Sequence, residues 1–222
     1  MDRNVLIVGA SGGIGHALAD AHEAAGWRVE RASRATGLDL LDEASIAALA
    51  ERIATPDRVI VATGVLHDGH QPERSMKALD PEHLIRDYRI NAIGPALVAK
   101  HLIPRMARDR PVVFAALSAR VGSISDNRLG GWHAYRASKA ALNMLIRTVA
   151  IEAARTHPQL IVCGLHPGTV VTDLSAPFQK GVPAERLFSP EQAAEQLMTV
   201  IDGLTPAQSG GVFAWDGAAI PA

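Results

Sequence analysis

Short apolar segments alternate along the chain with longer segments of helical periodicity. The apolar segments comprise residues 5–8, 27–32, 59–62, 112–117, 160–165 and 212–215. Several are apolar throughout, which is typical of strands that are buried on both faces. Helical periodicity occupies residues 14–25, 43–54, 81–107, 134–156 and 190–203. This alternation predicts a doubly wound α/β fold, in which helices cover both faces of a parallel sheet.

Size and composition fit one domain. The chain has 222 residues, of which nearly half are apolar, so we expect one core and a single domain over residues 1–222. No apolar run approaches the roughly 18 residues of a membrane span, and no cationic leader with a cleavage site opens the chain. A net charge of -1 argues against a nucleic-acid or membrane partner. The lone Cys163 cannot form an internal disulfide, which favours a cytoplasmic protein.

A glycine-rich segment joins the first predicted strand to the first predicted helix. It reads Gly9-Ala10-Ser11-Gly12-Gly13-Ile14-Gly15, a Gly-x-x-x-Gly-x-Gly spacing. Such a turn lets a pyrophosphate approach the helix N-terminus, where free N–H groups and the helix dipole favour anionic oxygen. A tight turn without a ligand is the alternative, but the strand before it and the helix after it favour a nucleotide site.

The end of the second predicted strand bears on the choice of cofactor. An acidic residue there would bind the adenosine ribose diol and disfavour a 2′-phosphate. The chain instead has Ser33 followed by Arg34, a hydroxyl and a cation that suit a phosphate. We therefore expect NADP(H) rather than NAD(H); the alternative is a surface arginine that is only solvated.

Tyr135 and Lys139 are the candidate catalytic pair. Four residues apart in a predicted helix, they project from the same face. A nearby ammonium favours the phenolate, so Lys139 is expected to lower the pKa of Tyr135 from about 10 toward the working range. By itself, this spacing is common on solvated helix faces. Ser118 ends a buried strand and Asn91 lies in an interrupted helix, so both could complete a site; a turn residue and an exposed break are the alternatives.

Together these motifs resemble the short-chain dehydrogenase/reductase family over almost the whole chain. The family's glycine motif falls on Gly9, Gly13 and Gly15. Its Asn-Ser-Tyr-Lys tetrad falls in order on Asn91, Ser118, Tyr135 and Lys139. Its Pro-Gly turn after the sixth strand is similar to Pro167-Gly168. Within the family, segments 118–131 and 166–174 are similar to the C-factor and sniffer-like carbonyl reductases.

The resemblance implies a Rossmann-type fold and hydride transfer between nicotinamide C4 and a carbonyl or alcohol substrate. Tyr135 would then be the general acid/base, and Ser118 would polarise the substrate oxygen. Lys139 would also hold the nicotinamide ribose, and Asn91 would position a water that links Lys139 to solvent. The implied cofactor contacts are Gly9, Ser11, Gly12, Gly13, Ile14, Gly15, Ser33, Arg34, Asp39, Leu40, Ala62, Thr63, Gly64, Tyr135, Lys139, Pro167, Gly168, Val170 and Thr172. A homodimer or homotetramer through the long helices is typical of the family.

The chain departs from the family after the second strand. Only four residues separate Arg34 from Asp39, where the family has a helix and a third parallel strand. Four extended residues span roughly 13 Å, which is too short for a parallel return. We expect the helix to be missing and the third strand to be absent or a stub. The charged segment 28–32 should then lie at or near the sheet edge.

Three loops carry further interpretations. Segment 174–188 resembles the family's substrate-covering lid, and an irregular surface connection is the alternative. The long interval between Ser118 and Tyr135 predicts a substrate loop, in which Trp132 and His133 either line the pocket or pack elsewhere. The sequence His67-Asp68-Gly69-His70 has no third ligand at a recognisable spacing, so we expect a polar loop and no metal site.

Two functions from different classes remain open. The intact tetrad favours an NAD(P)(H)-dependent oxidoreductase that acts on a small carbonyl or alcohol substrate. The alternative is a cofactor-binding regulatory or signalling protein with the same fold and little turnover. A sugar-nucleotide epimerase is disfavoured, because little chain remains for a separate substrate domain.

Overall fold

The central feature is a six-stranded parallel sheet. The computed structural model describes residues 3–67 and 69–222. In spatial order the strands are β2 (Arg28–Ala32), β1 (Asn4–Val8), β3 (Arg58–Val61), β4 (Val112–Leu117), β5 (Leu160–His166) and β8 (Val212–Ala214). Every neighbouring pair is parallel. All six coincide with predicted strands to within a residue or two, so the predicted parallel α/β sheet is confirmed.

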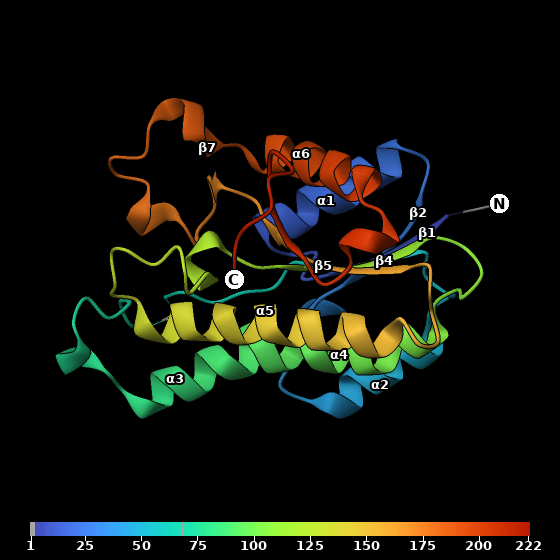
Figure 1. Ribbon diagram of the computed structural model, residues 1–222, viewed down its shortest axis with the longest axis horizontal. Helices are drawn as coiled ribbons and strands as arrows, with labels where there is room; N and C mark the ends of the chain where they lie inside the picture. The colour runs from blue at the N-terminus through green and yellow to red at the C-terminus, as the bar shows by residue number, and fades with distance from the viewer. Residues whose placement is uncertain (1–2, 68) are drawn as a thin grey trace.

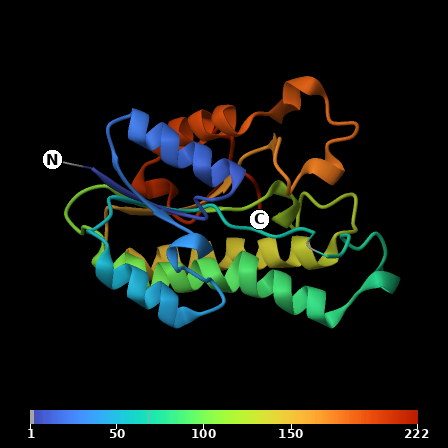
Figure 2. The ribbon, with the colours of Figure 1, turned by 180° about the vertical axis from the view of Figure 1, so that it is seen from behind.

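Helices cover both faces of this sheet (Figures 1 and 2). One face carries α1 (Gly13–Ala24) and α6 (Pro190–Gly203), and the other carries α2 (Glu43–Arg52), α4 (Gly94–Leu102) and α5 (His133–Ala153). The helix α3 (Pro81–Tyr88) leads into α4 and packs beside the start of α5. Among the described residues, no helix combines the length and the apolarity needed to cross a bilayer.

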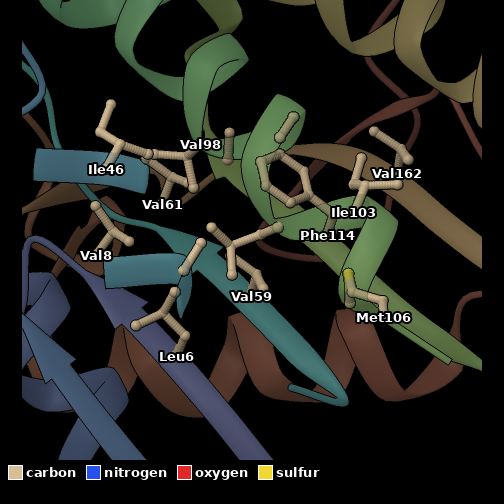
Figure 3. Packing of buried hydrophobic residues seen from close by; sticks show 14 of the residues in the cluster. Leu6, Val8, Ile46, Val59, Val61, Val98, Ile103, Met106, Phe114 and Val162 are labelled. Carbon is tan, nitrogen blue, oxygen red and sulfur yellow. The ribbon is translucent and has the colours of Figure 1, made fainter. Parts of the chain in front are cut away.

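Alternate residues of each central strand enter two separate cores. Leu6 and Val8 of β1 pack with Ile46, Val59 and other residues on the α2, α4 and α5 side (Figure 3). Their neighbours in β1 pack on the α1 and α6 side. Because both faces of the strand are covered, both sets of side chains must be apolar, and this explains the unbroken apolar segments in the sequence.

The strand β2 lies at the edge of the sheet, as the short connection predicted. A single 3₁₀ turn, Arg34–Thr36, stands where longer relatives have a helix, and the described residues form no strand beyond β2. The charged residues of β2 have specific partners: Arg31 Nη2 lies 2.6 Å from Asp20 Oδ1 and 3.0 Å from Glu23 Oε2 of α1. The expected loss of the helix and the third strand is therefore confirmed.

The long helix predicted over residues 81–107 is divided. Between α3 and α4, residues Arg89–Ile93 form a turn of π-helix, and a 3₁₀ turn, Ile103–Arg105, follows α4. The predicted break around Asn91 is thus present. It takes the form of a wider, π-helical turn, and Asn91 stays buried in it. A small parallel pair of strands, β6 (Thr169–Val170) and β7 (Leu187–Phe188), was not predicted. Its two strands bracket the segment between them, which includes most of the predicted lid.

The turn between β1 and α1 depends on a close approach at Gly15. A Cβ built at Gly15 would lie 2.2 Å from the carbonyl oxygen of Gly9, whereas one built at Gly12 would lie 3.5 Å from it. We therefore expect Gly15→Ala to lower the free energy of unfolding by about 2 kcal/mol or more, because a well-packed site must shift to admit the methyl group. Urea unfolding followed by circular dichroism measures this difference.

Gly12→Ala is the matched control for this prediction. Gly12 has φ -84° and ψ 159°, which alanine adopts without strain, so its substitution should cost less than about 1 kcal/mol. Equal losses in the two variants would contradict a steric origin.

Candidate active site

The glycine turn lies at the carboxyl edge of the sheet, against the loops that follow β3 and β5. Gly9 adopts φ 89°, and a Cβ there would meet the Thr63 methyl group at 2.8 Å. A Cβ at Gly13 would meet the Thr172 methyl group at 2.9 Å. The start of α1 has no side-chain cap and no acidic residue in its first turn, so its N–H groups and dipole are available to an anion. Thr63 Oγ1 is buried and has no hydrogen-bond partner within the described part of the chain.

Tyr135 and Lys139 lie on the inner face of α5, one turn apart, as predicted. Both are buried. Lys139 Nζ donates a 2.7 Å hydrogen bond to the carbonyl of Leu117, the last residue of β4, and lies 5.7 Å from the centre of the Tyr135 ring. The Lys139 ammonium is therefore held between the end of β4 and the tyrosine. The spacing of four residues is what brings both side chains to the same strand end.

Ser118 follows directly after β4 and is fixed by a residue further along α5. Its Oγ donates a 2.6 Å hydrogen bond to Asn143 Oδ1, and its backbone N–H donates to the carbonyl of Leu165 at 2.8 Å. Asn143 is one turn beyond Lys139, so a single helix face supplies Tyr135, Lys139 and the support for Ser118.

Asn91 is fully buried in the π-helical turn and joins three segments. Its Oδ1 accepts from the Val65 N–H at 2.8 Å, and its Nδ2 donates to the Val65 carbonyl at 2.9 Å and to Ser138 Oγ at 3.1 Å. This one amide therefore satisfies both backbone groups of a residue in the loop after β3 and ties that loop to α5. Asn91 is an internal brace in this structure, and the alternative of an exposed helix break is wrong.

A pocket of ≈ 220 Å³ opens beside these residues. Ser118 and Tyr135 form part of its wall with His166, and Trp132 and Phe178 form an aromatic side, their ring centres 4.7 Å apart. Trp132 has φ 51°, a backbone conformation that a bulky residue rarely adopts, and it immediately precedes α5. The predicted substrate loop and lid thus meet over the pocket through Trp132 and Phe178, whereas His133 does not line it.

Burial dominates the electrostatics of the site. The expected lowering of the Tyr135 pKa by Lys139 is wrong here, because burial, with a smaller contribution from Asp87, raises that pKa. Burial also lowers the pKa of Lys139 to about 8, so the ammonium has lost part of its advantage over the neutral amine. Burial likewise lowers the pKa of His166 to about 4, which leaves a neutral imidazole in the pocket at neutral pH.

The remaining predicted cofactor residues fall into three groups. Gly64 lies beside two residues of the predicted tetrad, since a Cβ there would be 3.5 Å from Asn91 Oδ1 and 3.6 Å from Lys139 Nζ. Pro167, Gly168, Val170 and Thr172 line the pocket. Ser33, Arg34 and Asp39 follow β2, the strand at the far end of the same edge, whereas Leu40 packs against Gly94 at the start of α4.

The polar loop after β3 contacts the lid segment through His67. His67 Nε2 lies 3.0 Å and 3.1 Å from the carbonyl oxygens of Asp173 and Leu174, and its ring contacts Phe178. Asp68 lies outside the described residues. Within the described part of the chain, no three histidine, cysteine or acidic side chains are grouped as metal ligands.

Sequence reasoning missed three residues at this site. Asn143 could have been found, because it continues the four-residue spacing of Tyr135 and Lys139. Glu73 and Asp87 gave no such signal: they are ordinary acidic residues in the sequence, yet both are buried behind α5 in the structure. Only the packing of α3 against α5 reveals them.

Comparison with known proteins identifies the family. A model of the short chain dehydrogenase family matches residues 30–182, which is more than half of the chain. The chain belongs to this family of oxidoreductases. A 1-hydroxy-2-glutathionyl-2-methyl-3-butene dehydrogenase of Rhodococcus sp. (strain AD45) is 32% identical over 226 residues, covering 93% of each chain. C-signal of Myxococcus xanthus is 35% identical over 144 residues, covering 64% of this chain and 81% of C-signal.

Solved structures of low sequence identity share the fold. Carbonyl reductase Sniffer of D. melanogaster superposes with a TM-score of 0.81 at 18% identity, covering all of both chains. An NADPH-bound carbonyl reductase from chicken fatty liver superposes with a TM-score of 0.84 at 22% identity, covering 100% of this chain and 94% of that one. The expected likeness to the C-factor and sniffer-like members of the short-chain dehydrogenases is therefore confirmed.

The bracing by Asn91 predicts a stability effect that is separate from catalysis. Asn91→Ala should lower the free energy of unfolding by about 2–4 kcal/mol, because the buried N–H and C=O of Val65 lose their partners. Ser138→Ala removes one of the three bonds of Asn91 and should cost only about 1 kcal/mol. Chemical denaturation measures both, and equal losses would show that Val65 is not the group at stake.

Proposed function

We propose that this chain is an NADP(H)-dependent carbonyl reductase or alcohol dehydrogenase in which Tyr135 is the general acid/base. The observation that carries the proposal is the convergence of Tyr135 and Ser118 on one pocket, with Lys139 and Asn91 packed behind them and the glycine turn on the same sheet edge. Residues 1–222 would act as one cofactor-binding domain. No feature of the site favours the regulatory alternative, for which Ser118 and Tyr135 need not meet.

The residues present fit a nicotinamide dinucleotide. The uncapped start of α1 suits the pyrophosphate, and Thr63 Oγ1 is a buried hydroxyl that still lacks a partner among the described residues. Thr172 lies against the glycine turn and also lines the pocket. It would therefore contact the cofactor between the pyrophosphate and the nicotinamide. When bound, the nicotinamide supplies the hydride to the carbonyl carbon or takes it from the alcohol carbon.

The side chains of this protein handle the proton and the substrate oxygen. In the reductive direction, Tyr135 Oη donates its proton to the carbonyl oxygen as that oxygen becomes negative, and Ser118 Oγ holds the same oxygen by a hydrogen bond. The raised pKa of Tyr135 keeps the phenol protonated until substrate arrives. The positive charge of Lys139 then favours the phenolate that remains, and proton uptake restores the tyrosine.

The pocket favours an uncharged carbonyl compound with an apolar flank. Trp132, Phe178 and Leu174 give it an apolar side, and its histidine is neutral at neutral pH. Arg120, which also lines it, has its charge balanced by Asp126, 2.7 Å away. Such a pocket buries an apolar substituent and leaves no unpaired charge for an ionic one.

The molecular surface supports self-association. Exposed apolar residues Ile85, Ile93, Met144 and Ile151 lie on the helical layer that contains α3 to α5. A homodimer or homotetramer would cover them. The single thiol, Cys163, is buried and its pKa is raised to about 12, so the chain suits a reducing compartment such as the cytoplasm.

The decisive test of the proposal is Tyr135→Phe. This variant keeps the ring and loses the acid, so turnover of NADPH with a panel of aldehydes and ketones should fall by roughly 10²–10⁴-fold. Binding of NADPH, measured by calorimetry, should stay within a few-fold of wild type. Near-normal turnover would end this mechanism, and a wild-type protein that binds NADPH without reducing any carbonyl would favour the regulatory alternative.

Cofactor preference is tested at the end of β2. Arg34→Glu should weaken NADPH binding by at least about tenfold, because a charge-assisted hydrogen bond to the 2′-phosphate contributes roughly 1.5–3 kcal/mol. NADH binding should change little. Arg28→Ala, at the opposite end of β2, is the control and should leave both affinities unchanged. A parallel loss of NADH affinity in Arg34→Glu would contradict the assignment.

A further inference from the structure

Two buried carboxyl groups lie behind the active site. Asp87, in the last turn of α3, is 1% exposed, and Glu73, in the segment before α3, is 4% exposed. Glu73 Oε2 accepts a 3.2 Å hydrogen bond from the N–H of Ala134 in the first turn of α5. Asp87 Oδ1 and Glu73 Oε1 are both buried without a hydrogen-bond partner within residues 3–67 and 69–222. A buried carboxylate oxygen without a hydrogen-bond partner is costly, so the presence of two of them here calls for a role.

The position of Asp87 ties it to the catalytic helix. Asp87 precedes Asn91 by four residues and therefore lies on the same side of the helix, one turn earlier. Asn91 on that side contacts Ser138, the neighbour of Lys139. The helices α3 and α5 pack together, and Glu73 is anchored on the first turn of α5. Asp87 is thus placed beside the turn of α5 that carries Tyr135.

The charged groups around Asp87 come from three segments. Arg86 and His83, both on α3, favour the ionised form of Asp87. Glu73, in the segment before α3, disfavours that form. Arg86 Nη1 lies 3.2 Å from His70 Nδ1, and the His70 ring stacks on His83 with 3.7 Å between ring centres.

From α5, the Lys139 charge favours the ionised form of Asp87. Burial outweighs all the favourable charges and raises the pKa of Asp87 to about 6, so the group is ionised at neutral pH. Its charge in turn raises the pKa of both Lys139 and Tyr135.

Lys139 has no carboxylate in salt-bridge contact among the described residues. Its one hydrogen bond is to the Leu117 carbonyl, and burial disfavours its charge. Among the described residues, Asp87 is the carboxylate whose charge acts on Lys139 to oppose that effect. Above pH about 6 Asp87 is negative, and below pH about 8 Lys139 is positive, so the coupled pair is charged in the window between.

We propose that Asp87 is a positioning residue that keeps Lys139 in its ammonium form, and that the neighbouring Glu73 modulates the charge of Asp87. The coupling is a property of the chain alone. Its consequence for turnover rests on the proposed function, since the ammonium matters to the reaction only if Tyr135 and Lys139 act on a substrate.

The coupling is measurable without turnover, because the chain has only four lysines, Lys77, Lys100, Lys139 and Lys180. Lysine labelled with ¹³C at Cε gives four NMR signals, and Lys139→Arg assigns the one of interest. In the wild-type protein that signal should titrate near pH 8. In Asp87→Asn, its midpoint should fall by roughly one to three pH units, the effect of removing one charge roughly 4 to 12 Å away at an effective dielectric of about 20. Lys100, paired with Glu43, should not move and serves as the internal control.

Glu73→Gln is the matched variant, since its amide oxygen can still accept from Ala134. It should leave the Lys139 midpoint nearly unchanged and shift to lower pH the small inflection near pH 6 that reports Asp87. Asp87→Asn should remove that inflection. If Asp87→Asn does not fold, as judged by circular dichroism, Asp87→Ala takes its place.

The turnover profile then tests the functional half. With wild-type protein, activity should fall at alkaline pH as Lys139 loses its proton. Asp87→Asn should shift this alkaline limb of the pH–activity profile to lower pH, by the same amount as the NMR midpoint of Lys139. A Lys139 midpoint that does not change in folded Asp87→Asn would overturn the coupling. A shifted midpoint with an unshifted alkaline limb would overturn its role in the reaction. Absence of turnover in every variant would refute the proposed function but leave the coupling standing.

Discussion

The arrangement of the site depends on one buried cation, the Lys139 ammonium, which is held at the carboxyl end of β4. Lys139 is almost completely buried, and in place of water it has one carbonyl, that of Leu117, and the electrostatic effect of the buried Asp87 carboxylate. Desolvation opposes this arrangement, and it persists because α5 is clamped along its inner face. Asn91 braces α5 from the π-helical turn, and Glu73 accepts from its first turn.

The same clamp explains why the surrounding loops converge. The loop after β3 is bound by Asn91 through Val65, and His67 from that loop bonds the carbonyls that open the lid segment. Trp132, held in a left-handed conformation at the start of α5, meets Phe178 of the lid. The loop after β3 and the lid segment are therefore both connected to α5 rather than placed independently of each other.

The shortened connection after β2 leaves this arrangement intact. Without the family's helix and edge strand, β2 is exposed, but β2 lies at one end of the sheet, away from β4 and β5, where Ser118 and Tyr135 line the pocket. The exposed edge carries charged side chains, and Arg31 pairs with Asp20 and Glu23 of α1. What the deletion changes is the environment of Ser33, Arg34 and Asp39, where the adenosine end of a dinucleotide would lie.

The sequence alone determined the layer architecture, the edge position of β2 and the shared helix face of Tyr135 and Lys139. These follow from local rules: buried strands must be apolar on both faces, four chain residues cannot span a parallel return, and residues four apart share a helix face. Ser118 and Asn91 were singled out by the family resemblance. Tertiary structure alone decided that burial raises the pKa of Tyr135 and that Glu73 and Asp87 are buried behind α5, each with one carboxylate oxygen that has no hydrogen-bond partner among the described residues. Both depend on how much water packing removes from each group, and that quantity is set by residues distant in the chain, so no local pattern records it.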